Sequence, residues 1–156
     1  NHAGEICAQA LYHGQSVTAR LENVRDSMTQ SAQEEADHLA WCARRLQELN
    51  DRPSMLDPLW YAGSFTIGMV AGLTGDRNSL GFVAETEKQV VDHLQSHLDQ
   101  LPQEDARTRA IITQMMEDEA RHGGQALQHG GVLPPGPIKT LMKATAKLMT
   151  SSSRWI

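Results

Sequence analysis

Two Glu-x-x-His motifs, Glu35–His38 and Glu119–His122, constrain this chain more than any other feature of its sequence. Residues three apart lie on the same face of an α-helix, so each motif directs a carboxylate and an imidazole to one point. A lone glutamate precedes each motif. Glu5 lies 30 residues before the first residue of the first motif, and Glu87 lies 32 residues before that of the second. The same pattern therefore occurs twice in the chain.

The spacing of each pattern predicts a helical hairpin. Residue 20 lies midway between the glutamates of the first pattern, in the segment 20–23 where the first helix is expected to turn. The midpoint of the second pattern is residue 103, beside the helix breaker Pro102. In an antiparallel hairpin, residues equidistant from the turn lie at the same height. Packing two such hairpins predicts an all-α fold, a four-helix bundle with four carboxylates and two imidazoles directed inwards.

A buried cluster of four carboxylates is tolerable only when cations neutralise it. Mixed carboxylate and imidazole donors suit iron or manganese, and this set is the one found in ferritin-like di-metal carboxylate bundles. For any single residue, a surface glutamate or a core histidine is the ordinary alternative, but that alternative does not explain six residues at matched heights. We therefore predict two metal ions with the ligands Glu5, Glu35, His38, Glu87, Glu119 and His122.

Two further acids occupy matching places in the two motifs. Glu34 and Asp118 each directly precede a predicted ligand glutamate. A ligating imidazole usually donates its other N–H to a carboxylate or a carbonyl, so we predict that these acids orient the histidines, the alternative being solvated acids. His93 and His97 follow Glu87 on the same predicted helix, where they either relay protons or face water.

Most of the remaining sequence also predicts helix, over residues 2–20, 24–49, 80–101, 103–129 and 138–149. Residues 58–75 carry no charge and reach the lower limit for a membrane span. Four glycines and several hydroxyl groups favour instead a buried crossover helix or a membrane-docking face. The last helix is amphipathic, with lysines at 139, 143 and 147 and Trp155 beyond it. Such a helix either lies on an anionic membrane or caps the bundle.

Composition excludes some classes of function. A net charge of −5 and an aromatic content of 4% do not fit a nucleic-acid partner, which needs a basic face or stacking aromatics. Cys7 and Cys42 have no metal-finger spacing and are interpreted as buried structural thiols.

Five segments resemble one family, the demethoxyubiquinone hydroxylases. They are residues 1–15, 34–38, 53–80, 85–94 and 118–122, so the similarity runs from His2 to about Ile138. The segment 118–122 alone also resembles bacterial multicomponent mono-oxygenases; its combination with the opening His-Ala-Gly-Glu is more specific. The resemblance implies a mono-oxygenase that hydroxylates the ring of a polyprenyl demethoxyquinol with dioxygen, in the penultimate step of ubiquinone biosynthesis.

The resemblance also implies how the residues act. It implies two iron ions on the same six ligands, electrons from a quinol or a nicotinamide donor, and catalytic roles for Glu87, Glu119 and His93. The polyprenyl tail needs an apolar groove, although the residues that could line one are equally explained as core. The candidates are Met55, Leu56, Leu59, Trp60, Phe65, Ile67, Met69 and Val70.

The family further implies peripheral membrane contact and a lipid-binding accessory protein of the pathway that docks on the apolar crossover. A homo-oligomer is compatible with the resemblance. The location would be the cytoplasmic side of a bacterial cell membrane or the matrix side of the mitochondrial inner membrane. We expect residues 1–156 to form one di-iron four-helix-bundle domain, preceded by residues before Asn1. The alternatives are a ferritin- or rubrerythrin-like iron-oxidising protein and a metal-free, membrane-associated helical module.

Overall fold

Six α-helices make up most of the computed structural model, which describes residues 1–153. No strand occurs within that range, so the expected all-α class is confirmed. The helices are α1 (His2–Thr18), α2 (Glu22–Glu48), α3 (Asp57–Leu73), α4 (Asp76–Gln100), α5 (Ala106–Gln128) and α6 (Gly136–Ser153).

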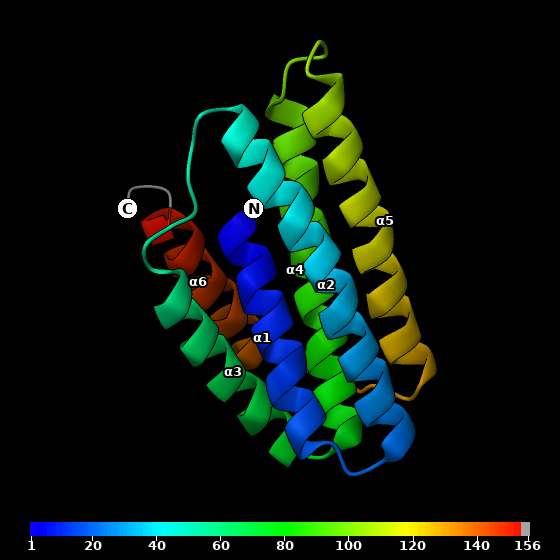
Figure 1. The fold of residues 1–156 in the computed structure, drawn as a ribbon. Helices are drawn as coiled ribbons and strands as arrows, with labels where there is room; N and C mark the ends of the chain where they lie inside the picture. The colour runs from blue at the N-terminus through cyan, green and yellow to red at the C-terminus, as the bar shows by residue number, and fades with distance from the viewer. Residues whose placement is uncertain (154–156) are drawn as a thin grey trace.

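The helices α1, α2, α4 and α5 form the bundle, and α3 and α6 lie outside it along α1 (Figure 1). The pairs α1–α2 and α4–α5 are the two predicted hairpins. The first turns at residues 19–21 and the second at residues 101–105. Arg45 of α2 reaches across the top of the bundle and pairs with Asp105, at 2.9 Å between Nη2 and Oδ1. Asp105 in turn caps α5 by accepting a hydrogen bond from the backbone N–H of Thr108.

Two helices begin at places that sequence spacing alone did not predict. Helix α4 begins at Asp76, before the expected Leu80. The carboxylate of Asp76 accepts hydrogen bonds from the backbone N–H groups of Arg20 and Leu21, at 3.0 and 2.9 Å. These bonds anchor the first hairpin turn. Helix α5 begins only at Ala106, because Asp105 is its capping residue.

The uncharged segment forms the crossover helix α3, which packs closely against α1. A Cβ atom on Gly14 would collide with the carbonyl oxygen of Phe65, and one on Gly68 would collide with that of Leu11. These two glycines therefore allow the two backbones to touch. None of the helices within residues 1–153 combines the length and the apolar character needed to cross a membrane.

The core has two apolar layers with a polar layer between them. Along α2, Met28 and Ala32 belong to one apolar cluster and Cys42 to the other, and Glu35 and His38 lie between. Helix α4 passes through the layers in the same order, and the antiparallel α5 passes through them in the reverse order. The fold thus presents one buried polar layer at mid-height of the bundle.

Helix α6 packs loosely, since Met149 is its only buried residue within the described range. The sequence suggested that Lys139 belongs to a free row of basic side chains, but in the structure it is paired with an acid. Its Nζ atom lies 2.9 Å from Oε2 of the buried Glu85 on α4. Lys143 and Lys147 are exposed, and Trp155 lies outside the described residues.

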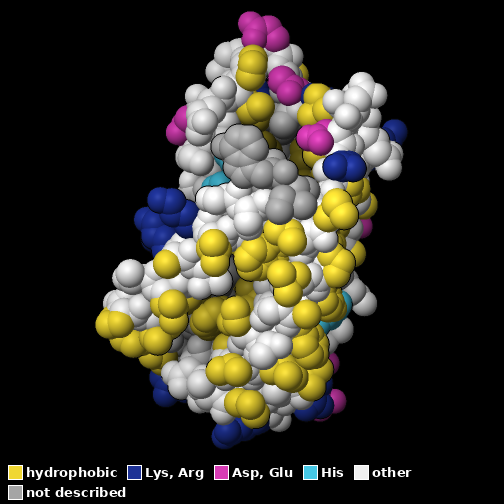
Figure 2. All heavy atoms as spheres, turned by 90° about the vertical axis from the view of Figure 1, so that its left-hand side faces the viewer, with side chains coloured by type: hydrophobic (Ala, Val, Ile, Leu, Met, Phe, Trp, Pro, Cys, Tyr) yellow, Lys and Arg dark blue, Asp and Glu magenta, His cyan; other side chains and the backbone are white. Residues whose placement is uncertain are grey.

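Exposed apolar side chains gather on the side of the molecule where α3 and α6 lie (Figure 2). We call this set the apolar face. It comprises Leu59, Ile67, Val70 and Leu73 of α3 and Ile138, Leu141 and Leu148 of α6.

Candidate metal centre

The polar layer brings together the six side chains with metal-ligand chemistry. They form two overlapping groups, and the ligand atoms within each group all lie within 4.8 Å of one another. The first group is Glu5, Glu35, His38 and Glu119, and the second is Glu35, Glu87, Glu119 and His122. All six residues are at most 3% exposed. Because Glu35 and Glu119 belong to both groups, the arrangement suits two ions that share two carboxylates.

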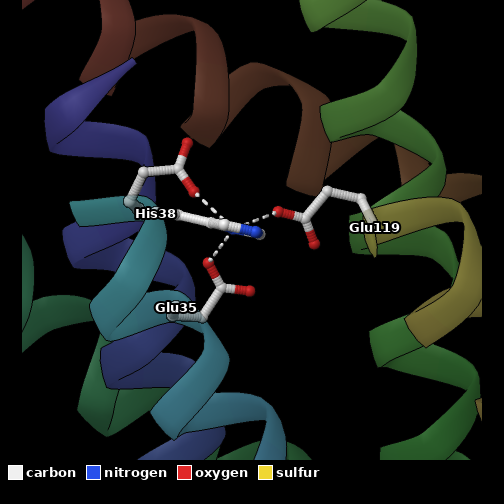
Figure 3. Close-up of side chains that lie close together, drawn as sticks. Glu35, His38 and Glu119 are labelled. Atoms are coloured by element: carbon white, nitrogen blue, oxygen red, sulfur yellow. Dashed lines mark hydrogen bonds and ion pairs between the residues drawn. The ribbon is translucent and has the colours of Figure 1, made fainter. Parts of the chain in front are cut away.

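The two histidines direct the same ring nitrogen into the cluster. Nδ1 of His38 lies 3.2 Å from Oε2 of Glu35 and 3.2 Å from Oε1 of Glu119, and 3.6 Å from Oε2 of Glu5 (Figure 3). Nδ1 of His122 lies 3.3 Å from Oε2 of Glu119. The spacing of each Glu-x-x-His motif explains this, since it stacks the two side chains on one helix face.

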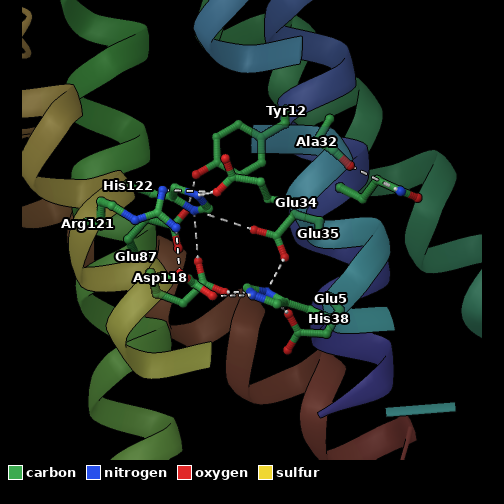
Figure 4. A network of polar contacts seen from close by, with 12 residues as sticks. Glu5, Tyr12, Ala32, Glu34, Glu35, His38, Glu87, Asp118, Arg121 and His122 are labelled. Carbon is green, nitrogen blue, oxygen red and sulfur yellow. Dashed lines mark hydrogen bonds and ion pairs between the residues drawn. The ribbon is translucent and has the colours of Figure 1, made fainter. Parts of the chain in front are cut away.

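The other ring nitrogen of each histidine meets an acid from the opposite hairpin (Figure 4). Nε2 of His122 on α5 lies 2.7 Å from Oε2 of Glu34 on α2. Nε2 of His38 on α2 lies 3.3 Å from Oδ2 of Asp118 on α5. The acids predicted to orient the histidines are therefore in contact with them, each acid with the histidine of the other motif.

Arg121 joins these two contacts and was not singled out by the sequence analysis. Its Nη1 atom lies 3.1 Å from Oε2 of Glu34, and its Nη2 atom lies 2.5 Å from Oδ1 of Asp118. One guanidinium thus holds both of these acids. Partial burial raises the pKa values of Glu34 and Asp118, but hydrogen bonds outweigh it and keep both pKa values low, led by His122 at Glu34 and by Arg121 at Asp118. The available signal was a cation inside the second motif, where the first motif has Asp37.

Two buried carboxylate oxygens without a hydrogen bond indicate that this cluster suits a cation. Oε1 of Glu35 and Oε2 of Glu87 are buried, and neither forms a hydrogen bond within the described part of the chain. Burying a carboxylate without a compensating charge costs on the order of several kcal/mol. Four carboxylates against two imidazoles leave negative charge in a dry layer, so the donor set fits a pair of divalent cations.

Without a cation, protons neutralise part of this charge. Burial, reinforced by neighbouring carboxylates, raises the pKa values of Glu35 and Glu87 well above their ordinary value. Burial also acts on Glu119, but hydrogen bonds from His122 and His38 outweigh it and hold its pKa at about 2. Burial opposes protonation of both histidines, yet hydrogen bonds to carboxylates raise their pKa values. A metal ion must therefore displace protons when it binds.

A tyrosine also enters the polar layer. The hydroxyl of Tyr12 on α1 donates a hydrogen bond to Oε1 of Glu87, at 2.5 Å. Burial raises the pKa of this phenol well above its ordinary value. Tyr12 was not among the residues that the sequence predicted for this layer. The available signal was its position two turns after Glu5, which places both side chains on one face of α1.

Other predicted site residues lie away from this layer. His93 is exposed on α4, with its ring centroid 4.3 Å from that of His97. Of the predicted substrate-channel residues, Met55 and Leu59 are exposed and Leu56, Trp60, Phe65 and Met69 are half-buried. None of them lines the narrow crevice between α1 and α4 that reaches Tyr12 and Glu87. The role of these residues in a substrate channel stays a prediction, as does the catalytic role of His93.

Two hairpins, each with a lone glutamate and a Glu-x-x-His motif, pack around one buried layer whose side chains could hold metal ions, which is the arrangement of ferritin-like carboxylate bundles. The sequence model of the family described as "Ubiquinone biosynthesis protein COQ7" matches residues 1–153. The chain belongs to this family, and the resemblance seen in its sequence is confirmed.

Relatives in several bacteria support the same assignment. The chain is 60% identical over 153 residues to a 3-demethoxyubiquinol 3-hydroxylase of Ralstonia pickettii, covering 98% of this chain and 70% of that protein. It is 54% identical over 156 residues to the protein of that name from Nitrosomonas europaea, covering 100% and 75%. It is 56% identical over 156 residues to the 3-demethoxyubiquinol 3-hydroxylase of Legionella pneumophila, covering 100% of this chain and 73% of that protein.

Proposed function

We propose that this protein is a 3-demethoxyubiquinol 3-hydroxylase, a mono-oxygenase that uses dioxygen to hydroxylate the ring of a polyprenyl demethoxyquinol in the penultimate step of ubiquinone biosynthesis. The observation that carries the proposal is the buried cluster of six ligand side chains with two shared glutamates. The relatives named above carry this activity in their names.

The six clustered residues are the proposed ligands of two iron ions, which supply the capacity to activate dioxygen when they are bound. Glu35 and Glu119 belong to both groups, so each could serve as a ligand to either ion. The contacts from Glu34 and Asp118 hold each imidazole with Nδ1 directed inwards. The apolar layers above and below exclude water, which strengthens every electrostatic contact inside the site.

The apolar face is the proposed contact with the membrane that holds the substrate. Contiguous exposed apolar side chains usually mark an interaction surface, and burying them contributes roughly 25 cal/mol per Å². The exposed Lys143 and Lys147 on α6 would add attraction to anionic lipid. We place the protein peripherally, on the cytoplasmic side of the cell membrane. The same face would receive a lipid-binding accessory protein, and a quinol or a nicotinamide would supply electrons.

An iron-oxidising protein of the ferritin or rubrerythrin type shares the six ligands and is the second candidate. It has no need for the apolar face, and the relatives do not favour it.

A product assay with isotopically heavy dioxygen separates the two candidates. Anaerobically iron-loaded protein is mixed with a short-tailed demethoxyquinol, then given the labelled gas, and the product is examined by mass spectrometry. We expect one heavy oxygen atom on the ring. Glu119→Ala should give no product, because Glu119 belongs to both ligand groups. The control is Glu117→Ala, which changes an exposed glutamate on the same helix. Oxygen consumption without a hydroxylated product would overturn the proposal in favour of iron oxidation.

A further inference from the structure

The contact between Tyr12 and Glu87 crosses from one hairpin to the other. Tyr12 is 2% exposed, and its hydroxyl donates to Oε1 of Glu87 across 75 positions of sequence. Its ring also meets the ring of His122 edge-on, with centroids 6.0 Å apart. Tyr12 is thus fixed on two sides and has little freedom to release the carboxylate.

The two oxygen atoms of Glu87 therefore differ. Oε1 is held by Tyr12, whereas Oε2 is buried and forms no hydrogen bond within residues 1–153. Glu87 also offers a ligand atom to the group formed with Glu35, Glu119 and His122. Carboxylates bind metal ions through one oxygen or through both. A hydrogen bond that engages one oxygen leaves the other as the metal donor.

The matching place in the other half of the duplicated pattern has no such donor. Tyr12 lies seven residues after Glu5, and Leu94 lies seven residues after Glu87. Leu94 is 1% exposed and packs in the apolar cluster that contains Cys42. The duplication therefore supplies a hydroxyl on α1 and an aliphatic side chain at the equivalent place on α4.

A narrow crevice between α1 and α4 leads to the contact. Its lining consists of Tyr12 and Glu87, the apolar Ala8, Leu11 and Val83, and the polar Gln15 and Thr86. Its space corresponds to about one water molecule. It therefore admits only a very small ligand and is too small for a quinol ring.

We infer that Tyr12 is a positioning residue that restricts Glu87 to one metal-binding oxygen and so keeps a coordination position free for a small ligand beside the crevice. This inference rests on the proposed function, because it presumes metal ions in the centre. Without the hydroxyl, both oxygens of Glu87 are available to the ion, and the second oxygen occupies the free position.

Tyr12→Phe tests this with azide, a three-atom probe, on chains loaded anaerobically with ferrous ions. Metal content per chain is measured first, followed by azide affinity from optical titration. We expect two ions per chain in Tyr12→Phe, as in the unmodified protein, and an azide affinity lower by about tenfold or more. The matched control is Tyr61→Phe, which removes a hydroxyl of α3 that bonds Nδ1 of His13 outside the centre. It should leave azide binding unchanged.

Equal azide affinity in Tyr12→Phe and the unmodified protein would overturn the inference, while full metal loading would leave the proposed function standing. A merely structural role for Tyr12 would lower thermal stability without changing azide affinity. The unmodified chain provides a second measurement should Tyr12→Phe not fold. On ferrous loading, its infrared difference spectrum should contain a one-oxygen carboxylate band that shifts in D₂O, and the absence of this shift would also overturn the inference.

Discussion

The two hairpins of the bundle carry the same ligand pattern in different surroundings. The α1–α2 hairpin adds Tyr12 and Glu34 to its three ligands, whereas the α4–α5 hairpin adds Asp118 and Arg121. Each outer acid contacts the histidine of the other hairpin. The duplicated pattern therefore does not produce two self-sufficient halves, because each half depends on the other to orient its imidazole.

The crossed contacts also explain how α2 and α5 are held together. These two helices pack against each other much less extensively than α4 packs against α5. The histidine–acid pairs and the ion pair of Arg121 with Glu34 connect α2 with α5. At the end of the bundle near the α4–α5 turn, two more ion pairs do the same, Arg45 with Asp105 and Arg107 with Glu48. The polar layer thus serves as the main brace between two helices that share little apolar contact.

The largest expected effect separates the shared ligands from the unshared ones. Glu35→Ala should leave the chain without tightly bound metal, because Glu35 belongs to both groups. Glu5→Ala and Glu87→Ala remove the matched lone glutamates of the two hairpins, and each should retain one ion. Metal content after gel filtration measures this. Equal loss in all three variants would show that the two groups bind as one unit.

The pH dependence of stability should differ between the metal-free and the metal-loaded protein. Glu35, Glu87, His38 and His122 have pKa values raised by folding, so the folded metal-free chain binds more protons than the unfolded chain. The contribution of these four groups to stability is therefore greatest at low pH and falls as the pH rises above the unfolded values, near 4.5 for glutamate and 6.5 for histidine. The low pKa of Glu119 acts in the opposite sense, but only between about pH 2 and 4.5.

Thermal melts from pH 5 to pH 8 measure this difference. We expect the Tm of the metal-free chain to fall over this range, with each kcal/mol lost lowering it by roughly 2–4 °C. Bound metal replaces the protons, so the stabilisation by metal should grow with pH. A metal-free Tm that rises between pH 5 and pH 8 would contradict the sign of these shifts.

A smaller effect tests the asymmetry of the crossed contacts. Glu34→Gln and Asp118→Asn should each weaken metal affinity, within about 10–100-fold for partners of ligating histidines. The loss should be greater for Glu34→Gln, because its contact with His122 is 2.7 Å and that of Asp118 with His38 is 3.3 Å. Titration against a competing chelator measures both. Asp37→Asn, an exposed change within the first motif, is the control, and a greater loss in Asp118→Asn would reverse the predicted order.

Helix periodicity explains why so much of the centre was predictable. A residue such as Glu35 has its place along and around α2 set by the 3.6-residue repeat, so matched spacing from the turn brings Glu5 to the same height. The contacts of Tyr12, Arg121 and Lys139 have no such basis. They depend on how one hairpin packs on the other and on where the loop after α5 directs α6. The sequence carries that information only through the packing of the whole chain.

The close approach of α1 and α3 has a mechanical consequence. Gly14 and Gly68 leave no side chain between the two backbones, and well-packed protein interiors are barely compressible. The two helices should therefore shift as one rigid body. A force on the outer surface of α3 would be transmitted to α1 with little damping and would displace Glu5 and Tyr12 within the polar layer.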